Sequence, residues 1–291
     1  MNLIKFNFLR YAIILFSVFS FSCGSELNNF TTSSDGVEIR FDIQGKGKTT
    51  IIFVHGWANN KSIWDAQVTH FSKKYNVITI DLAGFGESGN NRYNWTMSAF
   101  GEDVVAVINY LELKNVVLVG FSMGAPVVIE TAKRVPDKVL GLVLVDNLHN
   151  VEMKYSPEVI HFKDSIYMDV VANPTMEKLA PFFKNNKEES FKRVVSMLKN
   201  NDEPIVGWRE SLNDVFRWEN EDFLASLKKI KTPIISINSA QPATNIEAFK
   251  KYVPSYSAKI IPDTGHVVFW DDPEAFNSYL EESIKDFNKN K

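Results

Sequence analysis

Residues 115–125 read Asn-Val-Val-Leu-Val-Gly-Phe-Ser-Met-Gly-Ala, and this stretch decides the fold. The aliphatic run from Val116 to Val119 predicts a buried parallel strand, because strands covered on both faces are continuously apolar. The pattern G-x-S-x-G follows at once, over residues 120–124. A sharp reversal from strand into helix leaves the serine in a strained backbone conformation, which side chains at the two glycine positions would obstruct. We therefore expect Ser122 at the strand tip.

A helix is expected to begin just beyond this serine, over about residues 123–134. Its free N–H groups and the positive end of its dipole would point at the place where an oxyanion could form beside Ser122. The alternative is a tight strand-to-helix turn that carries an ordinary serine. The surrounding sequence has to decide between the two.

Outward from this strand, the chain alternates apolar strands with amphipathic helices. Helices are predicted over 63–71 and 96–111, and further strands over 37–43, 49–54, 77–81 and 139–145. This alternation indicates an α/β fold with a doubly wound parallel sheet. For the first pair of strands, an antiparallel arrangement is an open alternative. Active groups gather at the carboxyl ends of strands in such sheets. His55, Ser122 and Asp146 all occupy such ends.

The strand rhythm stops over residues 147–222, where helix-forming sequence predicts an inserted helical cap. Phe191, Val194, Val195 and Leu198 fall on one helical face. Most of the aromatic and methionine side chains of this segment are expected to be packing residues, although a lid over a reactive serine also needs an apolar lining. The side chains singled out here are Phe162, Tyr167, Met168, Phe182, Phe183, Phe191, Met197, Trp208, Phe216 and Trp218.

The sheet is predicted to resume after the cap, so that segments 36–146 and 223–291 form one core. Strands are expected over 232–238 and 259–261, with a helix over 245–252 between them. The last strand leads to Gly265-His266, where the glycine would let the loop turn. A final helix is predicted with Asp272 as its N-cap, because a proline and a glutamate follow in its first turn.

The first residues differ in character from the rest. Lys5 and Arg10 precede an apolar run that ends near Cys23, a pattern typical of a secretory signal, and we assign it to residues 1–22. Cys23 is the only cysteine of the chain, and its place at the cleavage point resembles a bacterial lipoprotein signal. That resemblance implies lipid attachment at Cys23, export and membrane anchoring, with residues 23–35 as a tether. An unlipidated secretory peptide is the alternative, since Ser20 stands where such signals usually carry leucine.

Composition excludes few other classes of protein. The 291 residues are 45% hydrophobic and 23% charged, which is ordinary for a globular protein. A net charge of -3 and a pI near 6.0 give no electrostatic case for a nucleic-acid partner. No pair of histidines has metal-ligand spacing with a carboxylate, so no metal is expected.

Four motifs in this order and spacing resemble the α/β-hydrolase fold superfamily. They are His55-Gly56-Trp57, Asp81-x-x-Gly84-x-Gly86-x-Ser88, Gly120-x-Ser122-x-Gly124 and Gly265-His266. The nearest likeness is to bacterial esterase-like serine hydrolases that have an HGW motif and a helical cap, and it covers about residues 36–288. It implies a mostly parallel eight-stranded sheet flanked by helices. It also implies that Ser122 is the nucleophile, His266 the base, and the N–H groups of Trp57 and Met123 the oxyanion hole.

The triad acid is where the chain departs from the commonest pattern of that superfamily. A serine hydroxyl needs an imidazole to take its proton, and the imidazole needs a carboxylate to fix its tautomer. The turn over residues 238–245 holds no carboxylate, although the superfamily usually has an aspartate there. The other place for the acid in the superfamily is after the sixth strand, which Asp146 ends here, so the resemblance implies Asp146 as the acid. A cap at the entry to the lid is its alternative role. Asp263 and Asp81 are expected to shape their own turns.

The first hypothesis is a serine hydrolase that cleaves an ester-type bond of a small or medium acyl substrate through an acyl-enzyme. Hydrolysis of carbon–carbon bonds, lactones or amides stays open, because the same triad serves them. A nearly inert receptor that uses the pocket for ligand binding is a rival of another class, kept open by the missing acid. No cofactor is implied, and the oligomeric state does not follow from the sequence.

Overall fold

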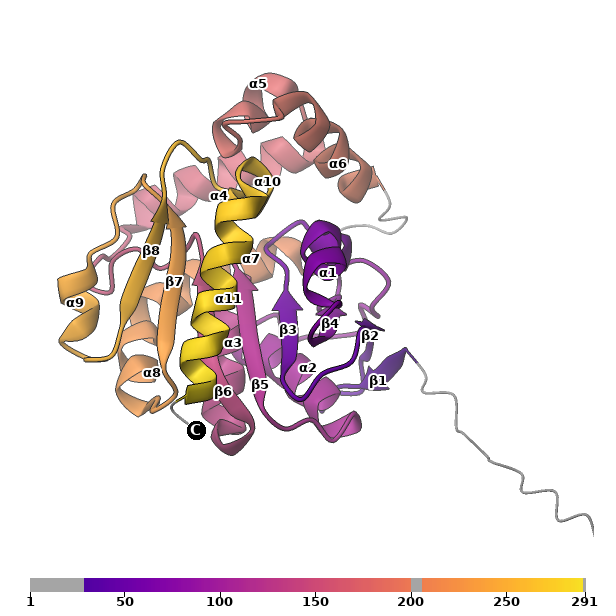
Figure 1. The fold of residues 1–291 in the computed structure, drawn as a ribbon. Helices are drawn as coiled ribbons and strands as arrows, with labels where there is room; N and C mark the ends of the chain where they lie inside the picture. Colours follow the sequence, from indigo (N-terminus) through magenta and orange to yellow (C-terminus); the bar gives the residue numbers. More distant parts are fainter. Residues whose placement is uncertain (1–28, 200–205, 290–291) are drawn as a thin grey trace, which may run out of the picture.

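The computed structural model describes residues 29–199 and 206–289, and it is built around one eight-stranded sheet (Figure 1). The strands lie in the order β1-β2-β4-β3-β5-β6-β7-β8. Their bounds are β1 Phe30–Thr32, β2 Glu38–Gln44, β3 Thr50–Val54, β4 Asn76–Ile80, β5 Val116–Phe121, β6 Val139–Val145, β7 Ile234–Ser239 and β8 Ser257–Ile261. Strand β2 pairs antiparallel with β1 and β4, and every other pairing is parallel. The predicted mostly parallel, eight-stranded sheet is confirmed.

Strand β5, which leads to Ser122, lies in the middle of this sheet between β3 and β6. All of its residues are buried, as its continuous apolar sequence predicts. Val54 at the end of β3 pairs with Gly120, so the residues after β3 lie beside the turn after β5. The register thus brings the HGW segment to the serine.

Helices cover both faces of the sheet (Figure 1). One apolar cluster packs α2 and α3 against the sheet, and a second packs α1, α10 and α11 on the opposite face. The core helices are η1 Lys61–Trp64, α1 Asp65–Phe71, α2 Met97–Tyr110, α3 Gly124–Arg134, η2 Pro136–Lys138, α8 Phe223–Lys229, α9 Ile246–Lys250, α10 Val268–Asp271 and α11 Pro273–Lys289. The predicted N-cap of the final helix is confirmed, because the Asp272 side chain accepts a hydrogen bond from the Ala275 N–H at 2.9 Å.

Between β6 and β7 the described part of the chain consists of helices joined by loops. Ahead of α8, these helices are α4 Pro157–Ala172, α5 Met176–Leu179, η3 Ala180–Phe182, α6 Lys187–Lys199 and α7 Trp208–Glu221. Figure 1 shows α4, α5 and α6 above the carboxyl ends of the strands. Helix α7 contacts α4 and also α2 and α3, so it joins this helical layer to the core.

The tether predicted over residues 23–35 is wrong for its second half. Strand β1 lies there and pairs with β2, with Thr31 opposite Ile39. The next residue but one, Ser33, donates a hydrogen bond to Asp103 on α2 at 2.7 Å. Asp103 also binds the buried guanidinium of Arg92. A polar segment therefore joins the sheet edge because a buried carboxylate and its cation hold it there, which composition alone did not reveal.

The first two predicted strands are not neighbours. The turn over residues 45–47 leads from β2 to β3, but β4 lies between them in the sheet. Strand β2 runs against β4, with Phe41 opposite Ile80. An antiparallel strand is therefore present at this edge, but the predicted pairing of residues 37–43 with 49–54 is wrong.

The predicted signal segment 1–22 and its lipid-attachment residue Cys23 lie outside the described residues. Among the helices of residues 29–199 and 206–289, none combines the length and the apolar character that a membrane span requires.

Candidate active site

The turn that carries Ser122 is too crowded for side chains on either flank. Ser122 has a φ of 50°, a left-handed conformation that is strained for a residue with a side chain. A Cβ atom on Gly120 would lie 2.2 Å from the Gly124 carbonyl oxygen, and one on Gly124 would lie 2.6 Å from the Val54 carbonyl oxygen. Both glycines are therefore required by close backbone approach, as the sequence predicts.

Main-chain hydrogen bonds fix the position of Ser122. Its N–H donates to the Val145 carbonyl at 3.0 Å, and its carbonyl accepts from the Ala125 N–H at 2.9 Å. The Asn147 side chain also donates to the Ser122 carbonyl, at 2.7 Å. The end of β6 thus holds the turn after β5, and the serine side chain is left to face the space beneath the helical layer.

His266 and Asp146 meet across the ends of two strands. His266 follows β8, and its Nδ1 lies 2.7 Å from Asp146 Oδ2. The other carboxylate oxygen, Oδ1, accepts from both the N–H and the Oγ of Ser239 at 2.7 Å. Burial would raise the pKa of Asp146, but hydrogen bonds from His266 and Ser239 and the attraction of the imidazole outweigh it and hold that pKa below its usual value. The structure thus brings Asp146, an ionised carboxylate, to the imidazole.

The loop that carries His266 is clamped by the helical layer. A Cβ atom on Gly265 would lie 2.5 Å from the Phe182 carbonyl oxygen, and Gly265 does not adopt a left-handed φ. The glycine is there because another backbone passes close by, and the expected role in turning the loop is wrong. The Asp271 carboxylate accepts from the Gly265 N–H at 2.7 Å and from the Lys184 N–H at 2.9 Å. Asp271 was not singled out from the sequence, because only its contacts distinguish it.

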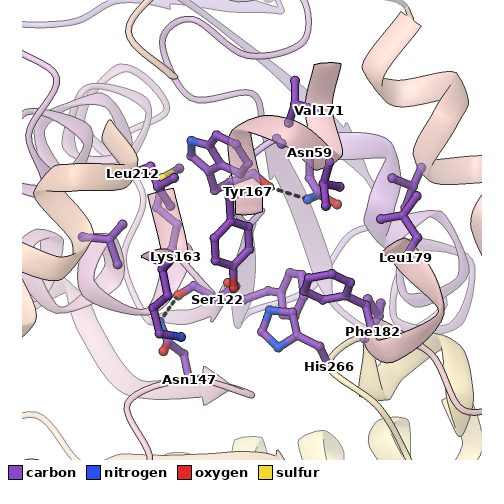
Figure 2. Close-up of a pocket in the computed structure, with 18 of the residues that line it drawn as sticks. Asn59, Ser122, Asn147, Lys163, Tyr167, Val171, Leu179, Phe182, Leu212 and His266 are labelled. Carbon is purple, nitrogen blue, oxygen red and sulfur yellow. Dashed lines mark hydrogen bonds between the residues drawn. The ribbon is translucent and has the colours of Figure 1, made fainter. Parts of the chain in front are cut away.

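Ser122 and His266 line one cavity of about 180 Å³, which lies between the carboxyl end of the sheet and the helical layer. Figure 2 shows both side chains on the same side of this cavity, below Tyr167. Much of the remaining wall is apolar and comes from residues between β6 and β7. Those side chains include Val170, Val171, Leu179, Phe182, Phe183, Val194, Leu198, Leu212, Val215 and Phe216.

The two residues expected to form an oxyanion hole, Trp57 and Met123, also line this cavity. Within the described residues, neither main-chain N–H donates a hydrogen bond to the protein. The Trp57 side chain is occupied differently, because its Nε1 donates to the Trp208 carbonyl at 2.7 Å. Both N–H groups are therefore free to bind an oxygen of a substrate.

The histidine of the HGW segment has a structural position. His55 is fully buried, its Nε2 accepts from the Leu82 N–H at 3.1 Å, and its Nδ1 lies 2.7 Å from the Gly56 carbonyl oxygen. Burial lowers the pKa of His55, so the ring stays neutral. A second histidine, His149, lies 3.8 Å from Asp146, and burial lowers its pKa as well. Neither ring lines the cavity.

Six polar cavity residues were not predicted as site residues, among them Asn59 and Asn147. Lys163 and Tyr167 lie on α4, Tyr155 lies just before it, and Glu219 lies on α7. Burial raises the pKa of Glu219 to about 7, although a hydrogen bond from Tyr155, the charge of Lys163 and a hydrogen bond from Asn147 all oppose it. The helical spacing of Lys163 and Tyr167 was available as a signal. Nothing in the sequence around Glu219 indicates that it faces a cavity.

Comparison with known proteins places the fold among hydrolases. A family model described as "alpha/beta hydrolase fold" matches residues 49–273. A bifunctional esterase/perhydrolase of Acinetobacter calcoaceticus is 26% identical over 222 residues, which are 72% of this chain and 80% of that protein.

Solved structures share the fold at lower identity. An esterase from Thermogutta terrifontis superposes with a TM-score of 0.73 at 24% identity, covering 89% of this chain and 98% of the other. An esterase from Exiguobacterium antarcticum gives a TM-score of 0.75 at 20% identity, covering 88% and 99%. The chain belongs to the alpha/beta hydrolase fold family and is a hydrolase.

Proposed function

We propose that this hydrolase cleaves ester bonds of small or medium acyl groups through Ser122, His266 and Asp146. One observation carries the proposal: the cavity that Ser122 lines also holds an imidazole whose Nδ1 lies 2.7 Å from a buried carboxylate. A serine hydroxyl at the end of a strand, followed in the chain by an acid and then by a histidine, suits acyl transfer. The absence of a carboxylate after β7 kept a receptor open as a rival, and the contact between Asp146 and His266 supports an enzyme instead.

In the first step, the Ser122 oxygen attacks the ester carbonyl carbon while His266 Nε2 takes the hydroxyl proton. Asp146 favours this transfer because it accepts a hydrogen bond from the Nδ1–H, which leaves Nε2 as the basic nitrogen, and because it stabilises the imidazolium. The serine and histidine side chains come into hydrogen-bond contact for this step, as catalytic contacts commonly tighten only with substrate present.

The attack moves an electron pair onto the carbonyl oxygen. In the proposed geometry the N–H groups of Trp57 and Met123 bind that oxyanion, and the amino end of α3 adds its positive dipole. The carbonyl then reforms, the bond to the alcohol oxygen breaks, and the imidazolium gives its proton to the departing alcohol. The acyl group stays on the Ser122 oxygen.

Water completes the cycle by the same route. His266 takes a proton from water, the hydroxide oxygen bonds to the acyl carbon, and the second tetrahedral intermediate is held by the same two N–H groups. When it collapses, the bond to the Ser122 oxygen breaks and the serine recovers its proton from the imidazolium. The products are one carboxylic acid and one alcohol, and the protein returns to its starting state.

The size and lining of the cavity suit a substrate with a small or medium acyl group. Its volume of about 180 Å³ accommodates a short acyl chain, and its apolar side chains would bury such a chain at a gain of about 0.8 kcal/mol per methylene. The relative from A. calcoaceticus is described as an esterase and perhydrolase. That description is the reason to prefer esters among the acyl compounds that this site would accept.

A fluorophosphonate probe tests the proposal, because it reacts with an activated serine. We expect labelling of the native protein and no labelling of Ser122→Ala. Ser165→Ala is the matched control, because Ser165 lies on α4, outside the cavity, and donates to the Phe162 carbonyl. A folded native protein that stays unlabelled, or equal labelling of both variants, would contradict the proposal. Nitrophenyl esters graded by acyl length, with a lactone and an anilide, then separate esterase from lactonase and amidase activity.

The proposed place of action rests on sequence alone. We infer export of the protein from a bacterial cytoplasm and attachment to a membrane through a lipid on Cys23. The intact mass of the mature protein tests this. A mass that starts at Cys23 and includes acyl chains would support the anchor, whereas an unmodified cysteine would refute it.

A further inference from the structure

One face of helix α4 brings two hydrogen-bond donors into the cavity. Lys163 and Tyr167 are four residues apart and therefore lie on the same side of the helix, followed on that side by Val170 and Val171. All four side chains line the cavity. Figure 2 shows the Lys163 side chain reaching toward Asn147 and the Tyr167 hydroxyl pointing toward Ser122.

Within the described residues, neither donor has a polar partner. The Lys163 ammonium lies 5.4 Å from the centre of the Tyr155 ring and 5.9 Å from that of Phe216, and it forms no hydrogen bond or ion pair there. These two rings hold the ammonium by cation–π attraction. The Tyr167 ring packs edge-on against Trp57, and its hydroxyl forms no hydrogen bond with the described residues. Burial raises the pKa of Tyr167, so this hydroxyl keeps its proton.

The other polar side chains of the wall are already engaged. Asn147 accepts from the Leu148 N–H at 2.8 Å and donates to the Ser122 carbonyl, while Asn59 donates to the Trp57 carbonyl at 2.7 Å. Lys163 and Tyr167 are thus the cap residues with donors to spare. An ammonium beside apolar walls gains most from an anion that shares its enclosure.

Glu219 is the carboxyl that competes for Lys163. The groups that face it are Tyr155, Tyr167, Lys163 and Asn147. Burial raises its pKa to about 7, so at neutral pH it carries only part of a negative charge. Lys163 attracts it at longer range without forming an ion pair. The positive charge at this end of the cavity is therefore only partly offset.

We propose that Lys163 and Tyr167 form a carboxylate-binding subsite, so that the preferred substrate is an ester that also carries a free carboxylate, such as a half-ester of a dicarboxylic acid. This inference rests on the proposed esterase function. In this arrangement the ammonium and the phenol bind the substrate carboxylate, Val170 and Val171 contact its short chain, and the ester carbonyl reaches Ser122. The products are one dicarboxylic acid and one alcohol.

Two esters of matched shape test the substrate class. Monoethyl glutarate carries the carboxylate, and ethyl 5-methylhexanoate replaces it with an isopropyl group. We expect the native protein to favour monoethyl glutarate in kcat/KM. In Lys163→Met, which keeps the aliphatic stem between the two rings, the ratio of the two kcat/KM values should fall by about tenfold to a hundredfold, as expected for loss of a charged hydrogen bond. Tyr167→Phe should lower the same ratio by a smaller factor.

A matched control and a second readout separate this inference from the proposed function. Lys192→Met removes one positive charge from α6, where Lys192 is exposed and pairs with Glu188 at 2.8 Å, and it should leave the ratio unchanged. Binding of glutarate to Ser122→Ala, measured by calorimetry, needs no catalysis and should weaken by a similar factor when Lys163→Met is added. An unchanged ratio together with unchanged glutarate binding would overturn the subsite while esterase activity stands. Glutarate binding that depends on Lys163 in a protein inert to every ester would support the subsite and refute the esterase.

Discussion

Replacing Asp146 by asparagine should impair turnover far more than the loss of one charge suggests. The reason is the second oxygen of the carboxylate, which accepts from the Ser239 N–H at 2.7 Å. In Asp146→Asn the amide oxygen has to take that place, because an NH₂ group there would face the N–H donor. The amide NH₂ then points at His266 Nδ1, 2.7 Å away in the native protein.

A donor at Nδ1 forces His266 into the other tautomer. The ring then holds its proton on Nε2, so this nitrogen cannot accept the proton of the Ser122 hydroxyl. A triad histidine in the wrong tautomer loses roughly 10⁴-fold in kcat, which is about 5.4 kcal/mol of transition-state stabilisation. The amide fills the same space as the carboxylate, so the fold and the cavity should be unaffected.

The measurements are the rate of phosphonate labelling and kcat on a nitrophenyl ester, with urea unfolding as a check on the fold. Asp263→Asn is the matched control, since Asp263 lies three residues before His266 with a φ of 54°, which asparagine tolerates. It should lower kcat less than about threefold, because a substitution that disrupts no buried contact usually changes a free energy by only about 0.5 kcal/mol. If kcat of a well-folded Asp146→Asn variant decreased by less than tenfold, the tautomer argument would be refuted.

Three further predictions follow from other contacts. The ratio of kcat/KM for monoethyl glutarate to that for its neutral analogue should fall as pH rises through about 7, because Glu219 then gains negative charge beside the proposed subsite. Glu219→Gln should make this ratio independent of pH in that range. Arg92→Met leaves Asp103 buried without its cation and should cost about 3–5 kcal/mol in urea unfolding; an unchanged midpoint would contradict the anchoring of β1. Gly124→Ala places a Cβ atom against the Val54 carbonyl and should cost about 1–3 kcal/mol in the same assay, with slower phosphonate labelling of Ser122.

The parts of the fold that were predictable are those where a local pattern has one physical meaning. The strand before Ser122 is continuously apolar, and both glycines around the serine meet backbone oxygens. Strand β1 was not predictable, because its place depends on Ser33 reaching Asp103, 70 residues away in the chain. Local propensity carries no information about a contact of that separation.

The candidate site divides in the same way. Asp146 was reached because it ends a predicted strand, and strand ends of a parallel sheet meet at one edge. Glu219 lies within helix α7 and Asp271 at the end of helix α10. A carboxylate in a helix is most often exposed to solvent, so the sequence gives no sign that these two are buried. Only packing of the cap on the core shows that one faces the cavity and the other clamps the His266 loop.

The clamp at Asp271 has a consequence for protein engineering. This carboxylate holds residues 184–185 and Gly265 together, and the Phe182 carbonyl rests where only a glycine leaves room. A graft that exchanges the cap for another would remove half of this junction and displace the imidazole with it. Residues 182–185 and 265–271 should therefore be transplanted together. The exposed side chains of α6, such as Lys192, can be redesigned without changing the position of His266.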